Sequence, residues 1–189
     1  MRWDELFADL GAQLSAAEVA ELAAEVADRT RREVGSLRMV DRLRPAVGAR
    51  LVVHATGLGT ARGTLLDAGT DWLLLHEDGA AELLLPSASV LSLTGVGGTA
   101  EVPSSEGSSV GEVARRLDLR WALRGLVRSR SGVQLVLRDG STVSGTLDRV
   151  GADHIDVAEH APGEARRAAA VRQVRLVPLT GVGAVRSWV

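Results

Sequence analysis

The amino-acid sequence predicts a mainly β protein with some α-helix. In this fold class an N-terminal helical hairpin precedes two tandem units, each made of one helix and five strands that close into a small barrel. Three observations lead to it: the sequence repeats itself, short apolar runs separated by Gly and Pro occur in both copies, and helix-start signals precede them. The two copies either stand as separate barrels or pair their edge strands into one continuous unit.

The internal repeat is visible at two places. Residues 61–77 and 143–159 share a Gly-Thr-Leu triplet, a second Gly, an Asp and a Glu at an offset of 82 positions. Residues 93–97 and 179–183 both read Leu-Thr-Gly-Val-Gly, with the offset grown to 86. We therefore expect about four extra residues in the second copy, near Pro162-Gly163.

The composition is that of a globular protein with room for one or two modest cores, since 46% of the 189 residues are apolar and 24% are charged. The chain has no Cys, which excludes disulfides, thiolate zinc sites and a Cys nucleophile. All 22 basic residues are Arg. We interpret this bias as the codon usage of a GC-rich bacterial genome rather than as guanidinium chemistry.

The charge pattern bears on location and partners. No run approaches the ~18 apolar residues of a membrane span, and the first residues are acidic where a signal peptide would be basic. These features predict a cytoplasmic protein without a membrane partner. The net charge of −2 gives no general attraction to nucleic acid, but Arg is concentrated in residues 29–50 and 111–149, in the segments just before each repeat.

Helix signals define the N-terminal hairpin, residues 1–36. Ser15 and Glu18 have the spacing of a capping box and predict a helix from about 16 to 34, which Gly35 would end. A shorter helix over about 2–13 should precede it.

The first barrel is expected at residues 37–97. A short basic stretch stops at Pro45, and five apolar runs predict strands at 51–53, 64–66, 72–75, 83–85 and 90–93. Residues 98–109 are rich in Gly, Ser and Pro, which is typical of a linker between domains.

The second barrel is expected at residues 110–189. A second capping box, Ser109 to Glu112, predicts an Arg-rich helix that runs to about Arg128. Asp139-Gly140 predicts a tight hairpin turn. The apolar runs predict strands at 133–137, 142–147, 154–158, 166–171 and 174–178.

A helix followed by a strongly bent five-stranded barrel resembles the Sm and Sm-like small barrels, a branch of the SH3-like architecture. The resemblance rests on Leu-Val-Leu-Arg-Asp-Gly at 135–140, Val-Ser-Gly-Thr-Leu at 143–147 and the closing strand at 174–177. It implies that Gly63 and Gly145 lie where a strand bends too sharply to carry a Cβ.

The same resemblance gives a test for RNA binding. Sm-like proteins that bind RNA usually carry an Asp, an aromatic or Met residue and an Asn in the loop after the bent strand. The matching segments here, 69–73 and 151–155, contain Asp71-Trp72 and Asp153-His154 but no Asn, and the Arg-Gly of the late strand is missing. The resemblance therefore does not extend to base-specific RNA binding.

An Arg row is the best functional candidate in the sequence. Arg116, Arg120, Arg124 and Arg128 recur every four residues, so they form a stripe on one surface of the predicted helix. Such a stripe can neutralise phosphates. The alternative is a solvated face that pairs with acids such as Glu112 and Asp118, or that docks on the acidic N-terminal hairpin.

No catalytic, metal or cofactor site is predicted. His154 and His160 share a strand face but would lie roughly 20 Å apart at about 3.3 Å per residue, too far for one ion. Residues 57–63 contain three Gly, but a strand rather than a helix follows them, so they do not form a dinucleotide loop.

Two functions remain open on this basis. The first is a non-enzymatic interaction module that contacts RNA or other nucleic acid through its Arg-rich helices. The second is a protein–protein adaptor or assembly subunit without nucleic-acid binding, whose strand edges and helical hairpin bind partner chains or further copies. Neither reading needs a cofactor, a metal or a small-molecule substrate.

Overall fold

A computed structural model describes residues 2–79, 81–97, 117–164, 166–167 and 169–188. The chain divides into two compact units, Met1–Arg38 and Met39–Val189. Within the described residues, no helix combines the length and the apolar character that a membrane crossing requires. The linker expected at 98–109 and the helix start expected at 109–116 lie outside the described residues.

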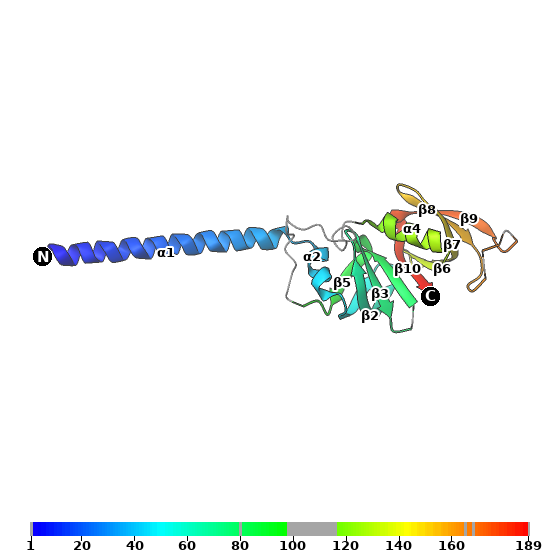
Figure 1. The fold of residues 1–189 in the computed structure, drawn as a ribbon, viewed down its shortest axis with the longest axis horizontal. Coiled ribbons are helices and arrows are strands. Elements are labelled where there is room, and N and C mark those ends of the chain that lie inside the picture. Colours follow the sequence, from blue (N-terminus) through cyan, green and yellow to red (C-terminus); the bar gives the residue numbers. More distant parts are fainter. Residues whose placement is uncertain (1, 80, 98–116, 165, 168, 189) are drawn as a thin grey trace. The chain divides into compact units, whose positions relative to one another are not determined.

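The first unit is a single helix, α1 (Trp3–Ser36), so the expected helical hairpin is wrong (Figure 1). The reason is that neither Gly11 nor Ser15 breaks the helix. One interior Gly costs only about 1 kcal/mol against Ala, and the flanking residues are mostly good helix formers. The helix runs through Gly35 and ends at Ser36, so Gly35 does not end it as expected.

Among its described residues, the second unit contains ten strands and several short helices. The strands are β1 (Arg50–Ala55), β2 (Gly59–Ala68), β3 (Trp72–Glu77), β4 (Ala81–Pro86), β5 (Val90–Thr94), β6 (Gly132–Leu137), β7 (Thr142–Val150), β8 (His154–Glu159), β9 (Gln173–Pro178) and β10 (Val182–Trp188). The helices are α2 (Met39–Leu43), α4 (Leu119–Ser129) and the 3-10 turns η1 (Arg44–Ala46), η2 (Ser87–Ser89) and η3 (Leu179–Gly181).

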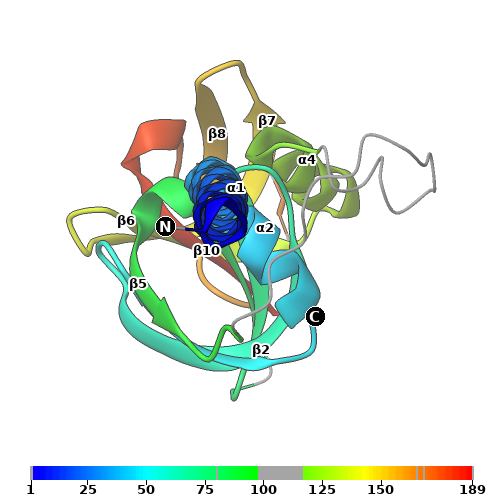
Figure 2. The ribbon, with the colours of Figure 1, turned by 90° about the vertical axis from the view of Figure 1, so that its left-hand side faces the viewer.

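All ten strands form one antiparallel sheet in the order β5-β1-β2-β3-β4-β10-β6-β7-β8-β9. The expected pair of separate barrels is therefore wrong. Each copy contributes five strands in the same pairing order, but β4 of the first copy pairs with β10 of the second. This junction satisfies two strand edges that separate barrels would leave with unpaired N–H and C=O groups. Figure 2 shows how strongly β2 curves within this sheet.

The two copies differ most before their fourth strand. Residues 78–80 connect β3 to β4, whereas residues 160–172 connect β8 to β9. The second copy is thus ten residues longer here, not four. The strand expected at 166–171 is wrong, and β10 was not expected at all. The Leu-Thr-Gly at 179–181 corresponds to η2 rather than to the end of β5, because η3 precedes β10 as η2 precedes β5.

Two apolar cores lie on opposite faces of the sheet at the junction. Leu84 lies opposite Val185, and both belong to the core built mainly from the second copy. Leu83, the next residue of β4, belongs to the other core, together with Val136 and Ala184 from β6 and β10. Successive residues of a strand point to opposite faces, so this alternation is what one continuous sheet requires. Each core therefore contains residues from both copies.

Candidate interaction surfaces

The predicted Arg stripe lies partly on α4. Leu119 and Leu123 are buried on one side of this helix, and Arg124 and Arg128 are exposed on another. Arg120 is half-buried, and its Nε donates to Asp118 Oδ2 at 2.7 Å. Arg116 lies outside the described residues. The structure therefore brings Arg124 and Arg128 to solvent, whereas Arg120 forms the ion pair with Asp118 that the alternative interpretation expected.

Asp118 is also the N-cap of α4, because its side chain accepts a hydrogen bond from the backbone N–H of Trp121 at 2.9 Å. Partial burial raises the pKa of Asp118. The hydrogen bonds from Arg120 and Trp121 outweigh that effect, so the pKa lies below its ordinary value. The acid is thus a structural residue at the start of α4.

The loop before β3 holds this helix start in place. Asp71 Oδ1 accepts a hydrogen bond from the backbone N–H of Leu119 at 2.7 Å, and Trp72 Nε1 donates to the carbonyl of Leu117 at 3.1 Å. The side chains of Asp71 and Trp72 are thus bonded to the chain's own segment before α4. In the second copy, Asp153 bonds His154 Nδ1 at 2.8 Å on the surface.

The Arg stripe gives a prediction about salt dependence. If Arg124 and Arg128 contact phosphates, the double variant Arg124→Gln/Arg128→Gln should lower the slope of log K against log salt by about two, because each lost contact removes close to one unit. The melting temperature should hardly change, since both side chains are exposed. Anisotropy titrations against mixed-sequence RNA and DNA at several salt concentrations, beside a thermal melt, measure both quantities. Equal slopes for the variant and the parent would contradict the contact.

The histidines do not gather into a metal site: the described residues include no group of three or more His, Asp and Glu side chains placed to hold an ion. His160 is buried and its ring bonds Thr146 Oγ1 at 2.8 Å and the Ala161 carbonyl at 3.0 Å. His54 lies near Thr60 Oγ1 at 3.3 Å on the surface. These contacts give each ring a structural partner.

The two ends of the sheet are strand edges with exposed apolar side chains. β5 pairs only with β1, and β9 pairs only with β8, among the described strands. Leu91 on β5 is 61% exposed, and Val174 and Leu176 on β9 are each 60% exposed. Edge strands with uncovered apolar side chains are templates for pairing with another chain.

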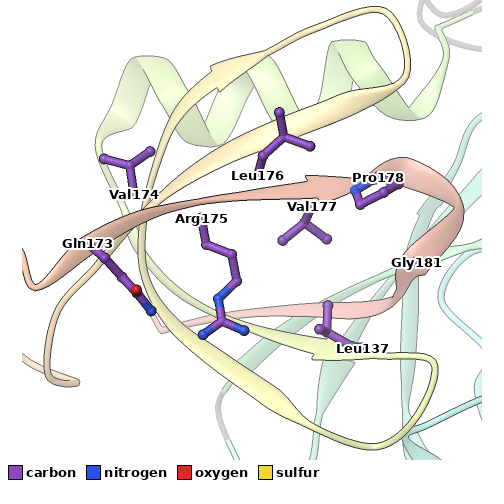
Figure 3. Close-up of a pocket in the computed structure, with 8 residues that line it drawn as sticks. All are labelled: Leu137, Gln173, Val174, Arg175, Leu176, Val177, Pro178 and Gly181. Atoms are coloured by element: carbon purple, nitrogen blue, oxygen red, sulfur yellow. The ribbon is translucent and has the colours of Figure 1, made fainter.

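A hollow of about 500 Å³ lies beside the β9 edge, between this strand, Leu137 at the end of β6 and Gly181 in η3 (Figure 3). Arg175 and Val177 point from β9 towards Leu137, whereas Val174 and Leu176 point to the opposite side of the strand. The hollow is therefore an opening of the second copy between its fourth strand and the end of its first.

The first copy shows what fills the equivalent opening. Pro178 lies opposite His154 as Pro86 lies opposite Trp72, so β9 is the counterpart of β4 and Arg175 is the counterpart of Leu83. Leu83 and Leu85 are buried in one core with Val136 and Ala184, which β6 and β10 supply. Within the described residues, no strand pairs with β9 on its outer side in the same way.

No protein-family model matches this chain, and no curated protein matches it. The sequence predicts strand edges as binding surfaces but does not show that β5 and β9 form them, nor that the hollow exists, because both depend on which strand pairs with which. The unequal polarity of β4 (Ala-Glu-Leu-Leu-Leu-Pro) and β9 (Gln-Val-Arg-Leu-Val-Pro) was the available signal.

Proposed function

We propose that the protein is a non-enzymatic assembly subunit, in which β9 of one chain pairs with β5 of the next chain. The observation that carries this proposal is the internal junction between β4 and β10. β9 is the counterpart of β4, and β5 is the counterpart of β10. The two free edge strands are thus the counterparts of the two strands that already pair once within the chain.

The internal junction between β4 and β10 also gives the register expected between β9 of one chain and β5 of the next chain. Ser92 lies opposite His54 on β1, as Ala184 lies opposite Val136 on β6, so Leu93 and Thr94 correspond to Val185 and Arg186. In the internal junction Val185 lies opposite Leu84, and Arg186 lies opposite Leu83. Between two chains, Leu93 of one should therefore lie opposite Leu176 of the other, and Thr94 opposite Arg175.

The side chains at the two edges match in polarity. In the internal junction Leu83 shares a core with Val136 and Ala184. In the junction between two chains, Arg175 of one chain takes the place of Leu83. His54 and Ser92 of the other chain take the places of Val136 and Ala184. The apolar side chains of the internal junction are thus replaced by polar side chains in the junction between chains, and this holds for both of the strands that meet there.

Arg175 already forms an ion pair with Glu159 within its own chain. Its Nε donates to Glu159 on β8, and Gln173 Nε2 donates to the same carboxylate at 3.0 Å. Partial burial raises the pKa of Glu159, but these hydrogen bonds hold it below its ordinary value. A charge that is already paired costs much less to bury than an isolated one. The Arg on the edge strand therefore does not oppose association.

Pairing of two different edges is a heterologous contact, which leads to a closed ring or to an open filament, depending on the rotation between neighbours. Nucleic-acid contact through the Arg stripe, the other function expected from the sequence, is the weaker candidate because Arg120 is already paired with Asp118.

Self-association is tested with Leu176→Arg. The parent chain should form species of several chain masses in analytical ultracentrifugation, whereas Leu176→Arg should sediment as a monomer because it places an unpaired charge inside the proposed interface. Leu66→Arg is the matched control, since Leu66 is also an exposed Leu but lies in β2, away from both edges. A monomeric parent chain at high micromolar concentration, or equal dissociation by both variants, contradicts the proposal.

A further inference from the structure

A second hollow, of about 280 Å³, lies where α4 ends. Three separate segments line it with an Arg: Arg130 follows α4, Arg149 lies in β7 and Arg166 lies in the connection between β8 and β9. Asp148 and the buried residue Thr146, both from β7, complete the polar part of its wall.

The hollow carries an excess of positive charge. Arg166 Nε and Nη2 donate to the two carboxylate oxygens of Asp148 at 2.6 and 2.7 Å. This pair is the main reason why the pKa of Asp148 lies below its ordinary value; burial opposes the shift, and the charges of Arg130 and Arg149 add to it. In the described part of the chain, no side chain forms a hydrogen bond with Arg130 or Arg149. Two guanidinium groups therefore remain available for an anion.

The backbone of Arg130 is strained. It has a φ of 51°, and it is the only residue other than Gly, among those the structure describes, in the left-handed region. This conformation is unfavourable for a residue with a Cβ and occurs preferentially at functional sites. Gly is the usual residue at such a helix C-terminus.

The first copy shows the sequence that the turn itself prefers. Gly48, with a φ of 89°, precedes β1 by the same two positions as Arg130 precedes β6. Asp148 is the extra residue of a strand bulge in β7, and Arg149 follows it; their counterparts at the bulge of β2 are Leu66 and Asp67. The Arg cluster is thus specific to the second copy, and its Arg130 replaces the residue that would relieve the strain.

We propose that Arg130, Arg149 and Arg166 form a binding site for a phosphate group. Guanidinium groups match phosphate oxygens in geometry as well as in charge. The hollow has a volume of about 280 Å³, which is room enough for a phosphate group. This inference does not depend on self-association.

The test is calorimetric titration of the full chain with inorganic phosphate at constant ionic strength, with chloride as the reference anion. The parent chain should bind phosphate, and Arg149→Gln and Arg130→Gly should each weaken binding by about tenfold or more, as expected for the loss of one charge-assisted hydrogen bond. Arg62→Gln, which removes an exposed Arg from β2, should leave the affinity unchanged.

Arg130→Gly separates binding from folding. Because it relieves the left-handed backbone, its melting temperature should not fall while its phosphate affinity does. Phosphate that binds no better than chloride, or an affinity that survives Arg149→Gln, overturns the proposal. A short mixed-sequence RNA that displaces the phosphate identifies a polynucleotide as the source of the group. An RNA that does not displace it assigns the site to free phosphate or a small phosphate ester.

Discussion

Replacing Leu84 with Ala should lower the free energy of unfolding by about 3 kcal/mol, whereas the same change at its counterpart, Leu176, should cost less than about 0.5 kcal/mol. The side chain of Leu84 is 5% exposed and lies in the core built mainly from the second copy, although it belongs to the first. Leu176 occupies the same position in the second copy and is 60% exposed. Removing a buried Leu side chain leaves a cavity, and removing an exposed one does not.

Denaturation by urea in dilute solution measures both costs. Because each core contains residues from both copies, Leu84→Ala should shift one cooperative transition of the sheet rather than melt one copy alone. A transition that splits in two, or equal costs at the two positions, would mean that the junction does not hold the copies together.

Gly145→Val should destabilise the protein by at least about 3 kcal/mol, because a Cβ at this position would lie 2.1 Å from the carbonyl oxygen of Ala158 on β8. The contact is with backbone, so no side chain can rotate to relieve it. Gly63 has the same environment in the first copy, with a Cβ position 2.3 Å from the carbonyl oxygen of His76.

Gly132→Ala is the matched control in a neighbouring strand, since no atom lies within 4 Å of its Cβ position. Thermal and urea melts of Gly145→Ala, Gly145→Val and Gly132→Ala should therefore rank the two Gly145 variants far below the control. Similar stabilities for all three would show that β7 and β8 do not approach each other closely at Gly145.

Local signals in the sequence locate most of the strands because each strand is a short apolar run between turn residues. Gly57, Gly69 and Pro86 lie at or beside strand ends, and Asp139-Gly140 forms the turn between β6 and β7. Thr142–Val150 and Gly59–Ala68 adopt equivalent places because they share the Gly that the neighbouring strand requires.

The pairing of β4 with β10 could not be predicted from local signals. Both strands are edges of their own copies, and the choice between separate barrels and one sheet depends on contacts between residues that lie a hundred positions apart. The prediction of an N-terminal hairpin was wrong for a local reason. Ser15 and Glu18 have the spacing of a capping box, but the residues on both sides of Ser15 favour helix, so one helix continues through it.

The candidate sites were only partly visible in the sequence. The spacing of Arg120, Arg124 and Arg128 correctly placed them on one helix, but their partners depend on where the helix starts, at Asp118. Arg130, Arg149 and Arg166 are far apart in sequence and have no shared spacing, so only the fold brings them to one hollow.

Cysteine cross-linking tests directly whether β9 of one chain pairs with β5 of another chain. The chain has no Cys, so Leu93→Cys/Leu176→Cys introduces the only thiols. Directly opposed residues of antiparallel strands have Cα separations of about 4.5–5.5 Å, which a disulfide can bridge. Oxidation should give a reducible ladder of covalently linked chains, and a mixture of the two single variants should give dimers only. Thr94→Cys/Leu176→Cys, whose side chains would point to opposite faces, should not form the ladder. Equal ladders from both double variants, or none from Leu93→Cys/Leu176→Cys, would contradict the proposed junction.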